Sequence, residues 1–476
     1  MIGEKRQRIA YIVGDYLAAN VAWIVYSALR FDMIQGSAGV AEIDDLYGFL
    51  TSGGTRLGIL FFPIMMVVIA YLSGYYNQVF FKSRLQELST TAMSTFIAAI
   101  IMFFSVLIND AFPERLINYE LVLSMWACIF AALYITRFFI TGRVVAKIES
   151  GKLKFRTLII GNNAKTAEFI RQNNRKYKAS GYHIEAIIRF GDEKAGSVVD
   201  GISVFPFSQI DRVCEMLSID TIIITVNEID KEQLFNLINN LFKYNVPIKI
   251  APELCDILTT KVRHDNILTE PLIDIAQNDM PDSQKSIKRA IDIVASAFAL
   301  TLLLPVFLII SILIKRDSKG PVIYKQERIG RHGKPFYIYK FRTMRNDAEK
   351  GNVPQLSSTD DPRVTRIGKF LRKYRLDETP QFWNVVKGDM SLVGPRPERR
   401  YFVDKIIERA PYFTLIYQVR PGITSLGMVK FGYATNIDEM ITRTKYDIIY
   451  IENMSLLIDI KIIIYTIKTV FTGKGL

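Results

Sequence analysis

The sequence is poor in the two residue types that most often build covalent cross-links and zinc sites. Only three cysteines and three histidines occur among its 476 residues. Cys128, Cys214 and Cys255 lie far apart and show no C-x-x-C spacing. A disulfide scaffold and a zinc site are therefore not expected, and any metal would be held mainly by oxygen ligands.

The pattern of a cleavable leader is also lacking. The first residues, MIGEKRQR, are followed by a long apolar run without a small-residue cleavage site. This arrangement is typical of a start-transfer anchor that stays in the chain.

The composition is instead rich in apolar residues and in positive charge. Half of the residues are hydrophobic, and the formal net charge is +13. A basic balance can indicate nucleic-acid binding, but together with long apolar runs it favours a membrane surface, so no nucleic-acid partner is expected. A chain of this length is also too long for one ordinary domain.

Residues 1–150 are predicted to form a four-helix transmembrane bundle. They contain four apolar runs, each long enough for a membrane-crossing helix, at about 9–29, 57–74, 91–108 and 121–141. The loops between them alternate in charge, and the positive-inside rule places both ends of the bundle in the cytoplasm. Asp15, inside the first run, is interpreted as a bundle-facing polar group rather than an ion site.

Three further segments follow the bundle. Short apolar strands alternate with helices over residues 151–255, which predicts a parallel, Rossmann-like α/β domain. Residues 256–285 are interpreted as a linker. Residues 286–476 are expected to form a mainly helical, α+β domain, with a β-hairpin that turns at residues 331–334.

The last domain opens with an apolar stretch, 291–314, whose path decides where that domain works. A helix of this length would measure about 36 Å, against about 30 Å of membrane hydrocarbon. Basic residues flank both ends, Lys288 and Arg289 among them, and a crossing would export one of these clusters. Pro305 breaks the helical hydrogen bonding and bends the chain. We predict a re-entrant helix over 288–314 that returns to the same face; a fifth span with a tolerated proline is the alternative.

Residues 363–388 carry the most basic stretch of the last domain. Arg363, Arg366, Lys369 and Arg372 recur every three residues, and apolar residues lie on the opposite side. This spacing predicts an amphipathic helix whose cationic face suits lipid headgroups or a diphosphate. A solvated surface helix is the alternative.

An acidic pair, Asp377 and Glu378, follows this basic stretch. An aspartate at this point could cap the next helix, with the neighbouring glutamate favoured by the helix dipole. Adjacent carboxylates among arginines can instead act as a nucleophile and as a base or metal ligand. The local sequence leaves both interpretations open. Downstream, Arg396 stands between two prolines that stiffen the backbone, which suits bidentate phosphate recognition.

These features occur together with further motifs that resemble one family. They are KRAID at residues 288–292, GPVIYKQERIG, KPFYIYKFRTM, LDETPQFWNVVKGDMSLVGPRPE and RPGIT. In this combination residues 286–476 resemble the bacterial sugar transferases, which are monotopic polyprenyl-phosphate phosphoglycosyl transferases. The whole chain resembles the large members of that family, which begin exopolysaccharide, capsule or O-antigen assembly.

The resemblance implies transfer of a sugar-1-phosphate from a UDP-sugar to undecaprenyl phosphate, with release of UMP. It implies that Asp377 is the nucleophile of a covalent phosphosugar intermediate and that Glu378 assists as base or metal partner. Mg²⁺ is the implied cofactor, held by these two carboxylates. Arg396 is the implied phosphate clamp. The weaker candidates for binding substrate phosphates are Lys340, Arg342 and Arg372.

The resemblance also implies a location and partners. We expect a multi-pass protein of the bacterial inner membrane that contacts membrane lipids and has its active site on the cytoplasmic face. A homodimer through the front domains is one option for its assembly. The transferred sugar is not determined by the sequence, and glucose and galactose are family-level options.

Two departures from expected patterns bear on this interpretation. Leu304 stands before the bending proline, where family members usually have serine, so a serine hydrogen bond to the freed backbone is lost. Residues 161–167 read GNNAKTA where a dinucleotide binder has G-x-G-x-x-G, and only Gly161 matches. We therefore expect the α/β domain to serve regulation or assembly.

Two rival functions make different demands on the sequence. A membrane-anchored, NAD-dependent nucleotide-sugar dehydratase or epimerase would need the glycine fingerprint and a Tyr-x-x-x-Lys pair, and residues 153–255 contain neither. A match at Tyr401 and Lys405 lies in the last domain and is interpreted as chance. A non-enzymatic scaffold for polysaccharide export is the second rival. The tail from Ser455 is expected to form an interfacial helix.

Overall fold

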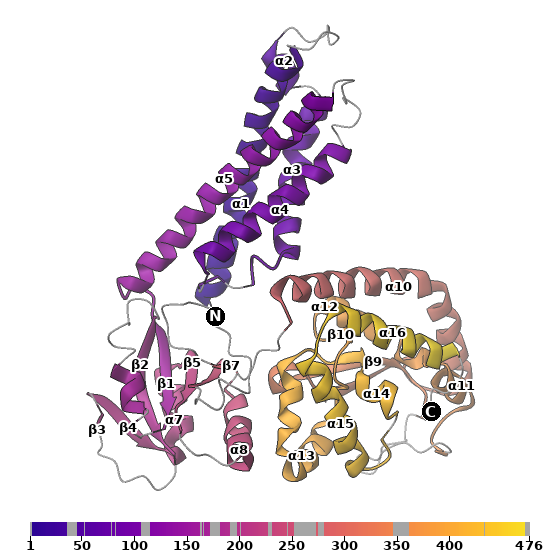
Figure 1. Cartoon of the computed structure of the whole chain (residues 1–476). Coiled ribbons are helices and arrows are strands. Elements are labelled where there is room, and N and C mark those ends of the chain that lie inside the picture. Colours follow the sequence, from indigo (N-terminus) through magenta and orange to yellow (C-terminus); the bar gives the residue numbers. More distant parts are fainter. Residues whose placement is uncertain are drawn as a thin grey trace.

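The computed structural model of the chain consists of a helical bundle, a sheet domain and a C-terminal domain (Figure 1). The residues that it describes are 2–35, 45–51, 53–77, 79–80, 82–105, 115–161, 164, 166–171, 181–190, 198–199, 201–226, 231–244, 246–251, 273–274, 280–345, 361–432 and 434–471. Cys255 and most of the loop 345–362 lie outside this part of the chain.

Four long helices form the bundle, and the short α2 (Leu46–Leu50) lies at its far end (Figure 1). They are α1 (Ile2–Gln35), α3 (Gly53–Leu72), α4 (Arg84–Ser105) and α5 (Arg115–Glu149). Each includes all or most of one of the four predicted apolar runs. In the part of the chain that the structure describes, five helices are long and apolar enough to cross a membrane: these four and α10.

A buried ion pair joins α1 to α5 inside the bundle. Asp15 accepts hydrogen bonds from Arg137 Nη2 and from the Tyr76 hydroxyl, each at 2.7 Å. Both side chains of the ion pair are fully buried. Charges inside an apolar bundle are stable only when they are paired. The prediction that Asp15 faces the bundle is therefore confirmed.

In the second domain, the described residues form a seven-stranded sheet in the order β3-β4-β2-β1-β5-β6-β7. The parallel strands are β1 (Phe155–Ile160), β2 (Tyr182–Arg189), β4 (Ile202–Pro206), β5 (Thr221–Ile224) and β6 (Ile248–Ile250). Two short strands, β3 (Val198–Val199) and β7 (Ile273–Asp274), pair antiparallel at the edges. The runs of isoleucine are buried because helices cover parallel sheets. The predicted parallel α/β domain is confirmed, and its described helical elements include η2 (Phe207–Gln209), α7 (Ile210–Leu217) and α8 (Lys231–Phe242).

Close backbone packing explains the glycine at position 161 without a bound nucleotide. Its φ is +135°, and a Cβ at this position would lie 2.6 Å from the Thr225 hydroxyl oxygen. That hydroxyl also pairs with the Thr166 hydroxyl at 2.7 Å. The glycine thus allows the end of β1 to approach the chain that follows β5.

The C-terminal domain combines a hairpin with many short helices. The hairpin is β8 (Ile323–Ile329) and β9 (Pro335–Phe341), joined by η3 (Arg331–Gly333), so the predicted turn is confirmed. The remaining elements are α11 (Arg366–Lys373), η4 (Leu376–Glu378), α12 (Gln381–Lys387), β10 (Ser391–Val393), α13 (Arg400–Arg409), η5 (Pro411–Gln418), β11 (Gly422–Thr424), α14 (Leu426–Lys430), α15 (Ile437–Glu452) and α16 (Leu456–Phe471).

Helix α10 (Asp282–Asp317) opens this domain and contacts it at both ends. In its first half, Asp292 accepts hydrogen bonds from the Ser391 hydroxyl and the Leu392 backbone N–H. In its second half, Ile310 and Ile314 pack in one cluster with Phe341 and Leu371. Figure 1 shows α10 running across the top of the domain and bending downward toward α11. Pro305 lies inside the helix and accounts for the bend.

The helix begins earlier than predicted. Residues from Asp282 onward are helical, so the end of the expected linker 256–285 is part of α10. Here α10 also meets the bundle: the Asn77 side chain, which follows α3, donates to the Asp282 carbonyl at 3.0 Å and to the Ser286 hydroxyl at 3.2 Å. The linker prediction was wrong at this end because α10 continues toward the bundle contact. It was also wrong at β7, which lies inside the predicted linker but pairs with β6 in the sheet.

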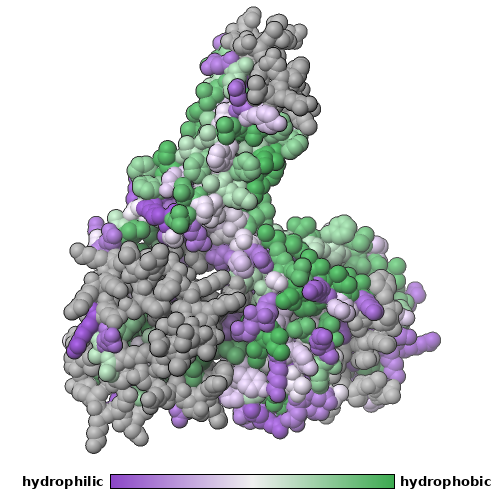
Figure 2. Space-filling model, in the orientation of Figure 1, coloured by the Kyte–Doolittle hydropathy of each residue, from purple (hydrophilic) through white to green (hydrophobic). Residues whose placement is uncertain are grey.

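The outer face of α10 is strongly apolar. Val294, Phe298, Leu302 and Leu308 are each more than 60% exposed. Figure 2 shows hydrophobic surface on the bundle and again over the upper edge of the C-terminal domain. Several apolar side chains of α16 are also exposed, Ile460 and Ile464 among them. Exposed apolar surface of this extent indicates contact with a membrane.

Candidate active site

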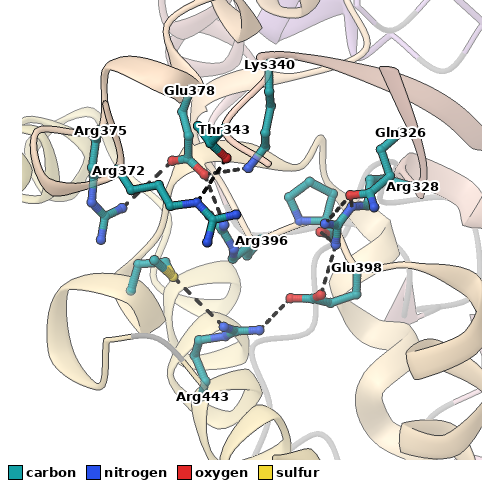
Figure 3. Close-up of polar contacts among 12 residues, drawn as sticks. Gln326, Arg328, Lys340, Thr343, Arg372, Arg375, Glu378, Arg396, Glu398 and Arg443 are labelled. Atoms are coloured by element: carbon teal, nitrogen blue, oxygen red, sulfur yellow. Dashed lines mark hydrogen bonds and ion pairs between the residues drawn. The ribbon is translucent and has the colours of Figure 1, made fainter. Parts of the chain in front are cut away.

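Glu378 is the centre of a cationic cluster (Figure 3). Its Oε1 accepts hydrogen bonds from Lys340 Nζ at 2.7 Å and from Arg396 Nη2 at 3.0 Å. Its Oε2 lies 3.9 Å from Arg375 Nη1. The carboxylate is buried, and these three cations compensate for its loss of water. Lys340 comes from β9 and Arg396 from the turn after β10, so the fold brings residues distant in sequence to the acidic pair.

The acidic pair lies in the tight turn η4. Arg375, just before this turn, has φ +54°, a left-handed conformation that residues other than glycine seldom adopt. Neither carboxylate caps the next helix, because α12 has Pro380 at its N-cap and no side-chain capping bond. The capping interpretation of Asp377 is therefore wrong.

Helix α11 carries Arg372 into the site. Its N-cap is Thr365, whose hydroxyl accepts from the Gly368 backbone N–H at 3.0 Å. Gly368 lies against the backbone of Thr343, and a Cβ there would clash with the Thr343 carbonyl oxygen. This close approach lets Arg372 Nε donate to the Thr343 hydroxyl at 3.0 Å.

The predicted basic helix is shorter than its charge pattern suggested. Arg363 was expected on its cationic face, but it precedes the helix and pairs with Asp361 at 2.6 Å. The threonine cap starts the helix only at Arg366, and the helix ends at Lys373 because the chain then turns at Arg375. The prediction for Arg363 was therefore wrong.

The two carboxylates have opposite pKa shifts. Burial and the charge of Glu378 raise the pKa of Asp377 to about 6, although Lys340 and Arg372 oppose the shift. Burial also disfavours the charged form of Glu378, but Lys340, Arg396 and Arg375 outweigh it and hold its pKa well below the usual range. Glu378 is therefore ionised throughout the physiological range, while Asp377 is ionised near neutral pH and protonated in mild acid.

Three predicted basic residues have partners elsewhere in the protein. Both Nη atoms of Arg342 donate to backbone carbonyls just after α10, those of Ser318 and Lys319. Lys288 Nζ donates to Asp459 at 2.7 Å and to the Val393 carbonyl. The Arg289 guanidinium donates to two carbonyls of α12, those of Val385 and Val386. These residues attach α10 to the domain, and Arg342 lies outside the cluster around Glu378.

A second charged group lies next to Arg396 and was not predicted. Glu398 accepts from Arg328 Nη1 at 3.2 Å and from Arg443 Nη2 at 2.5 Å (Figure 3). Arg328 comes from β8 and Arg443 from α15. The PRPE motif could have pointed to Glu398, but no local pattern distinguishes Arg443 from other basic residues on a helix.

The site offers few ligands for a metal. Among the described residues, no group of three or more His, Cys, Asp or Glu side chains could hold an ion. Mg²⁺ nevertheless binds commonly through one or two carboxylates together with substrate phosphates and water. Asp377 and Glu378 supply the two carboxylates that this mode requires.

Taken together, these elements define a membrane protein whose polar site combines two carboxylates with several arginines beside an apolar helix. The family model described as bacterial sugar transferase matches residues 283–473. A second model, described as a CoA-binding domain, matches residues 71–252.

Relatives extend this result. A UDP-glucose:undecaprenyl-phosphate glucose-1-phosphate transferase of Caulobacter vibrioides is 41% identical over 187 residues, which cover 39% of this chain and 70% of that protein. A UDP-N-acetylgalactosamine-undecaprenyl-phosphate N-acetylgalactosaminephosphotransferase of Aeromonas hydrophila is 40% identical over 231 residues, 48% of this chain and 54% of that protein. A Klebsiella pneumoniae UDP-glucose:undecaprenyl-phosphate glucose-1-phosphate transferase is 34% identical over 260 residues, 54% of this chain and 56% of that protein.

The chain therefore belongs to the bacterial sugar transferase family. It spans about half the length of the Aeromonas and Klebsiella relatives. A solved UDP-D-quinovosamine 4-dehydrogenase from Vibrio fischeri matches 25% of this chain and 93% of its own, at 21% identity and a TM-score of 0.21, which is too weak to support a shared activity.

Proposed function

We propose that the protein transfers a sugar-1-phosphate from a UDP-sugar to undecaprenyl phosphate and releases UMP. The observation that carries this proposal is the buried Glu378 held by Lys340 and Arg396, next to a less acidic Asp377. A site with several cations and a carboxylate suits an anionic diphosphate substrate. The family membership and the names of the relatives support the same reaction class.

The proposed reaction has two displacements at phosphorus. An Asp377 carboxylate oxygen forms a bond to the phosphorus that carries the sugar, and the bond from that phosphorus to the bridging oxygen breaks, so UMP leaves with the electron pair. An oxygen of undecaprenyl phosphate then forms a bond to the same phosphorus. The acyl–phosphate bond breaks, Asp377 returns as a carboxylate, and undecaprenyl-diphosphate-sugar is the product.

The surrounding side chains have separate roles in this scheme. Near neutral pH Asp377 is ionised, as a nucleophile must be, and Arg372 and Lys340 stabilise its charge. Glu378 is too weak a base to accept a proton at that pH, so we assign it two other roles: it fixes Lys340 and Arg396, and it serves as a metal partner. Mg²⁺ bound by the two carboxylates and the substrate would neutralise diphosphate charge and so reduce the repulsion of an incoming carboxylate.

The position of α10 supports access to both substrates. Its ends attach to one domain through Asp292 and Ile314, while its outer face is apolar. We infer that α10 is re-entrant, bends at Pro305 within the membrane and keeps the domain on the cytoplasmic face of the inner membrane. A membrane-bound lipid phosphate and a soluble nucleotide sugar can meet there.

A dehydratase or epimerase is not favoured, because Gly161 has a packing role and the family match covers a transferase domain. We assign the sheet domain to regulation or assembly, including assembly of a homodimer.

The decisive assay incubates purified full-length protein with undecaprenyl phosphate and a panel of UDP-sugars and measures UMP. We expect UMP release from one or a few of the donors. Repeated turnover should require the lipid. Asp377→Asn should abolish that release. A wild-type protein that releases UMP with none of the donors contradicts the proposal.

A further inference from the structure

The turn formed by residues 395–398 is fixed at every residue. The Pro395 carbonyl accepts from the Gly422 backbone N–H at 2.9 Å. The Arg396 backbone N–H donates to the buried carboxylate of Asp447 on α15. The Pro397 carbonyl accepts from Arg328 at 3.2 Å, and the Glu398 carbonyl accepts from the Ile329 N–H at 3.0 Å. The backbone that carries the Arg396 guanidinium therefore depends on β8, on β11 and on α15.

The Glu398 carboxylate connects two of these elements. It lies between Arg328 and Arg443, and all three side chains are largely buried. Arg328 is held further by the Gln326 side-chain oxygen, at 2.7 Å from Nη2 and 3.1 Å from Nε. Arg443 and Asp447 lie one helical turn apart on α15, so one helix face holds both the backbone and the end of the turn.

Stability alone does not explain this arrangement. Taking three charged groups out of water is costly, and apolar side chains of similar size usually stabilise a fold as well or better. Buried ionic groups instead fix relative positions, since removing one partner leaves another charge uncompensated. The position that this cluster fixes is that of Arg396, which lies two residues before Glu398.

We propose that Arg443, acting through Glu398, is a positioning residue for Arg396. The two prolines have fixed φ angles, so a displacement of Glu398 moves the Arg396 backbone with little local relaxation. Arg396 contacts Glu378 in the site, whereas Arg443 contacts Glu398 and Met428. A catalytic group that moves by about 1 Å can lose about 100-fold in rate. The inference rests on the proposed function in one respect: it takes the ligand of Arg396 to be a substrate phosphate.

The test compares Arg443→Met, which keeps much of the side-chain length, with Arg443→Lys, which keeps the charge. The matched control is Arg409→Met, an exposed arginine of α13 that pairs with Asp438 at 3.1 Å. We expect kcat/KM for UMP release to fall about 10- to 100-fold in Arg443→Met, to recover partly in Arg443→Lys and to stay within about twofold in the control. Thermal unfolding midpoints show whether each variant is folded.

A double-mutant cycle separates positioning from a merely structural role. In an Arg396→Met background, Arg443→Met should add less than about a twofold loss, because the group that it positions is gone. The inference is overturned if the fold-losses in kcat/KM of the two single variants multiply in the double variant. It is also overturned if the Arg443→Met protein is as active as wild type. If Arg443→Met does not fold, Glu398→Gln replaces it in the same cycle with the same expectations.

A second readout keeps the inference testable if the proposed reaction is wrong. Inorganic pyrophosphate is titrated calorimetrically into each full-length variant in detergent. Arg443→Met and Arg396→Met should weaken its binding by similar factors, and the double variant should be no weaker. Wild-type protein that binds pyrophosphate but releases no UMP from any donor contradicts the proposed function alone. Pyrophosphate binding that is absent in the wild type or unchanged in Arg443→Met overturns the positioning role.

Discussion

The replacement Asp377→Asn should stabilise the protein while it removes the proposed nucleophile. The pKa of Asp377 is raised from 3.8 to about 6, mainly by burial. The folded state therefore binds the proton more tightly than the unfolded state does. The stability that this group contributes is complete below about pH 4 and is lost as the pH rises through about 6.

The size of the effect follows from the pKa difference. A pKa raised from 3.8 to about 6 corresponds to about 3 kcal/mol that the folded protein loses once Asp377 is fully ionised. Asparagine has nearly the same shape and carries no charge. The stability advantage of the variant should therefore grow from about 1 kcal/mol near pH 4.5 to about 3 kcal/mol near pH 8.

The assay is thermal unfolding of full-length protein in detergent, without added Mg²⁺, at both pH values. The control is Asp438→Asn, which removes an exposed carboxylate at the start of α15 and should change the midpoint little at either pH. A variant that is no more stable than wild type near pH 8 would refute the reasoning. A stability difference between the variant and wild type that does not become smaller at acidic pH would also refute it, because ionisation of Asp377 would then not be the cause of the difference.

Four further predictions concern other parts of the chain. The kcat/KM for UMP release should rise with pH through about 6, because Asp377 must be ionised to attack; a flat profile between about pH 5 and 8 would count against it. Gly368→Ala should reduce activity at least tenfold or so, since its Cβ would force α11 away from Thr343, and unchanged kinetics would contradict the packing argument. A cysteine at the exposed Lys319, in a chain whose own cysteines are replaced, should react only with a reagent on the cytoplasmic side of sealed vesicles; labelling from the other side would favour a fifth span. Arg137→Met should lower the unfolding midpoint by an amount equivalent to about 3 to 5 kcal/mol, and adding Asp15→Asn should restore part of it; two losses that simply add would show that the ion pair is not the cause.

Much of the fold was predictable because local patterns determine it. The apolar runs of the bundle, the isoleucine-rich parallel strands and the hairpin turn at residues 331–334 each follow from composition and spacing over a short window. Asp15 was also interpreted correctly, since a charge inside an apolar run needs a partner in the bundle.

The site was only partly predictable because its geometry depends on contacts across the chain. The sequence pointed to Lys340, Glu378 and Arg396, and the structure brings these three together. Arg342 belongs to the same KFRTM motif as Lys340, yet its guanidinium holds the carbonyls that follow α10. No short pattern shows which basic residue of a strand meets the site.

Periodicity also misled at the start of α11. The spacing of basic residues continued through Arg363, but the Thr365 cap starts the helix after it. The role of Arg443 could not be anticipated, because it follows from the packing of α15 against a turn 45 residues away along the chain.

Trapping of the covalent intermediate tests the central claim most directly. Wild-type protein is incubated with its UDP-sugar in the absence of undecaprenyl phosphate, and UMP and the intact mass are measured. We predict one UMP released per active site and a phosphosugar on the peptide that contains Asp377, with neither in Asp377→Asn. An adduct on another residue, or UMP release that strictly requires the lipid from the first turnover, would contradict the account.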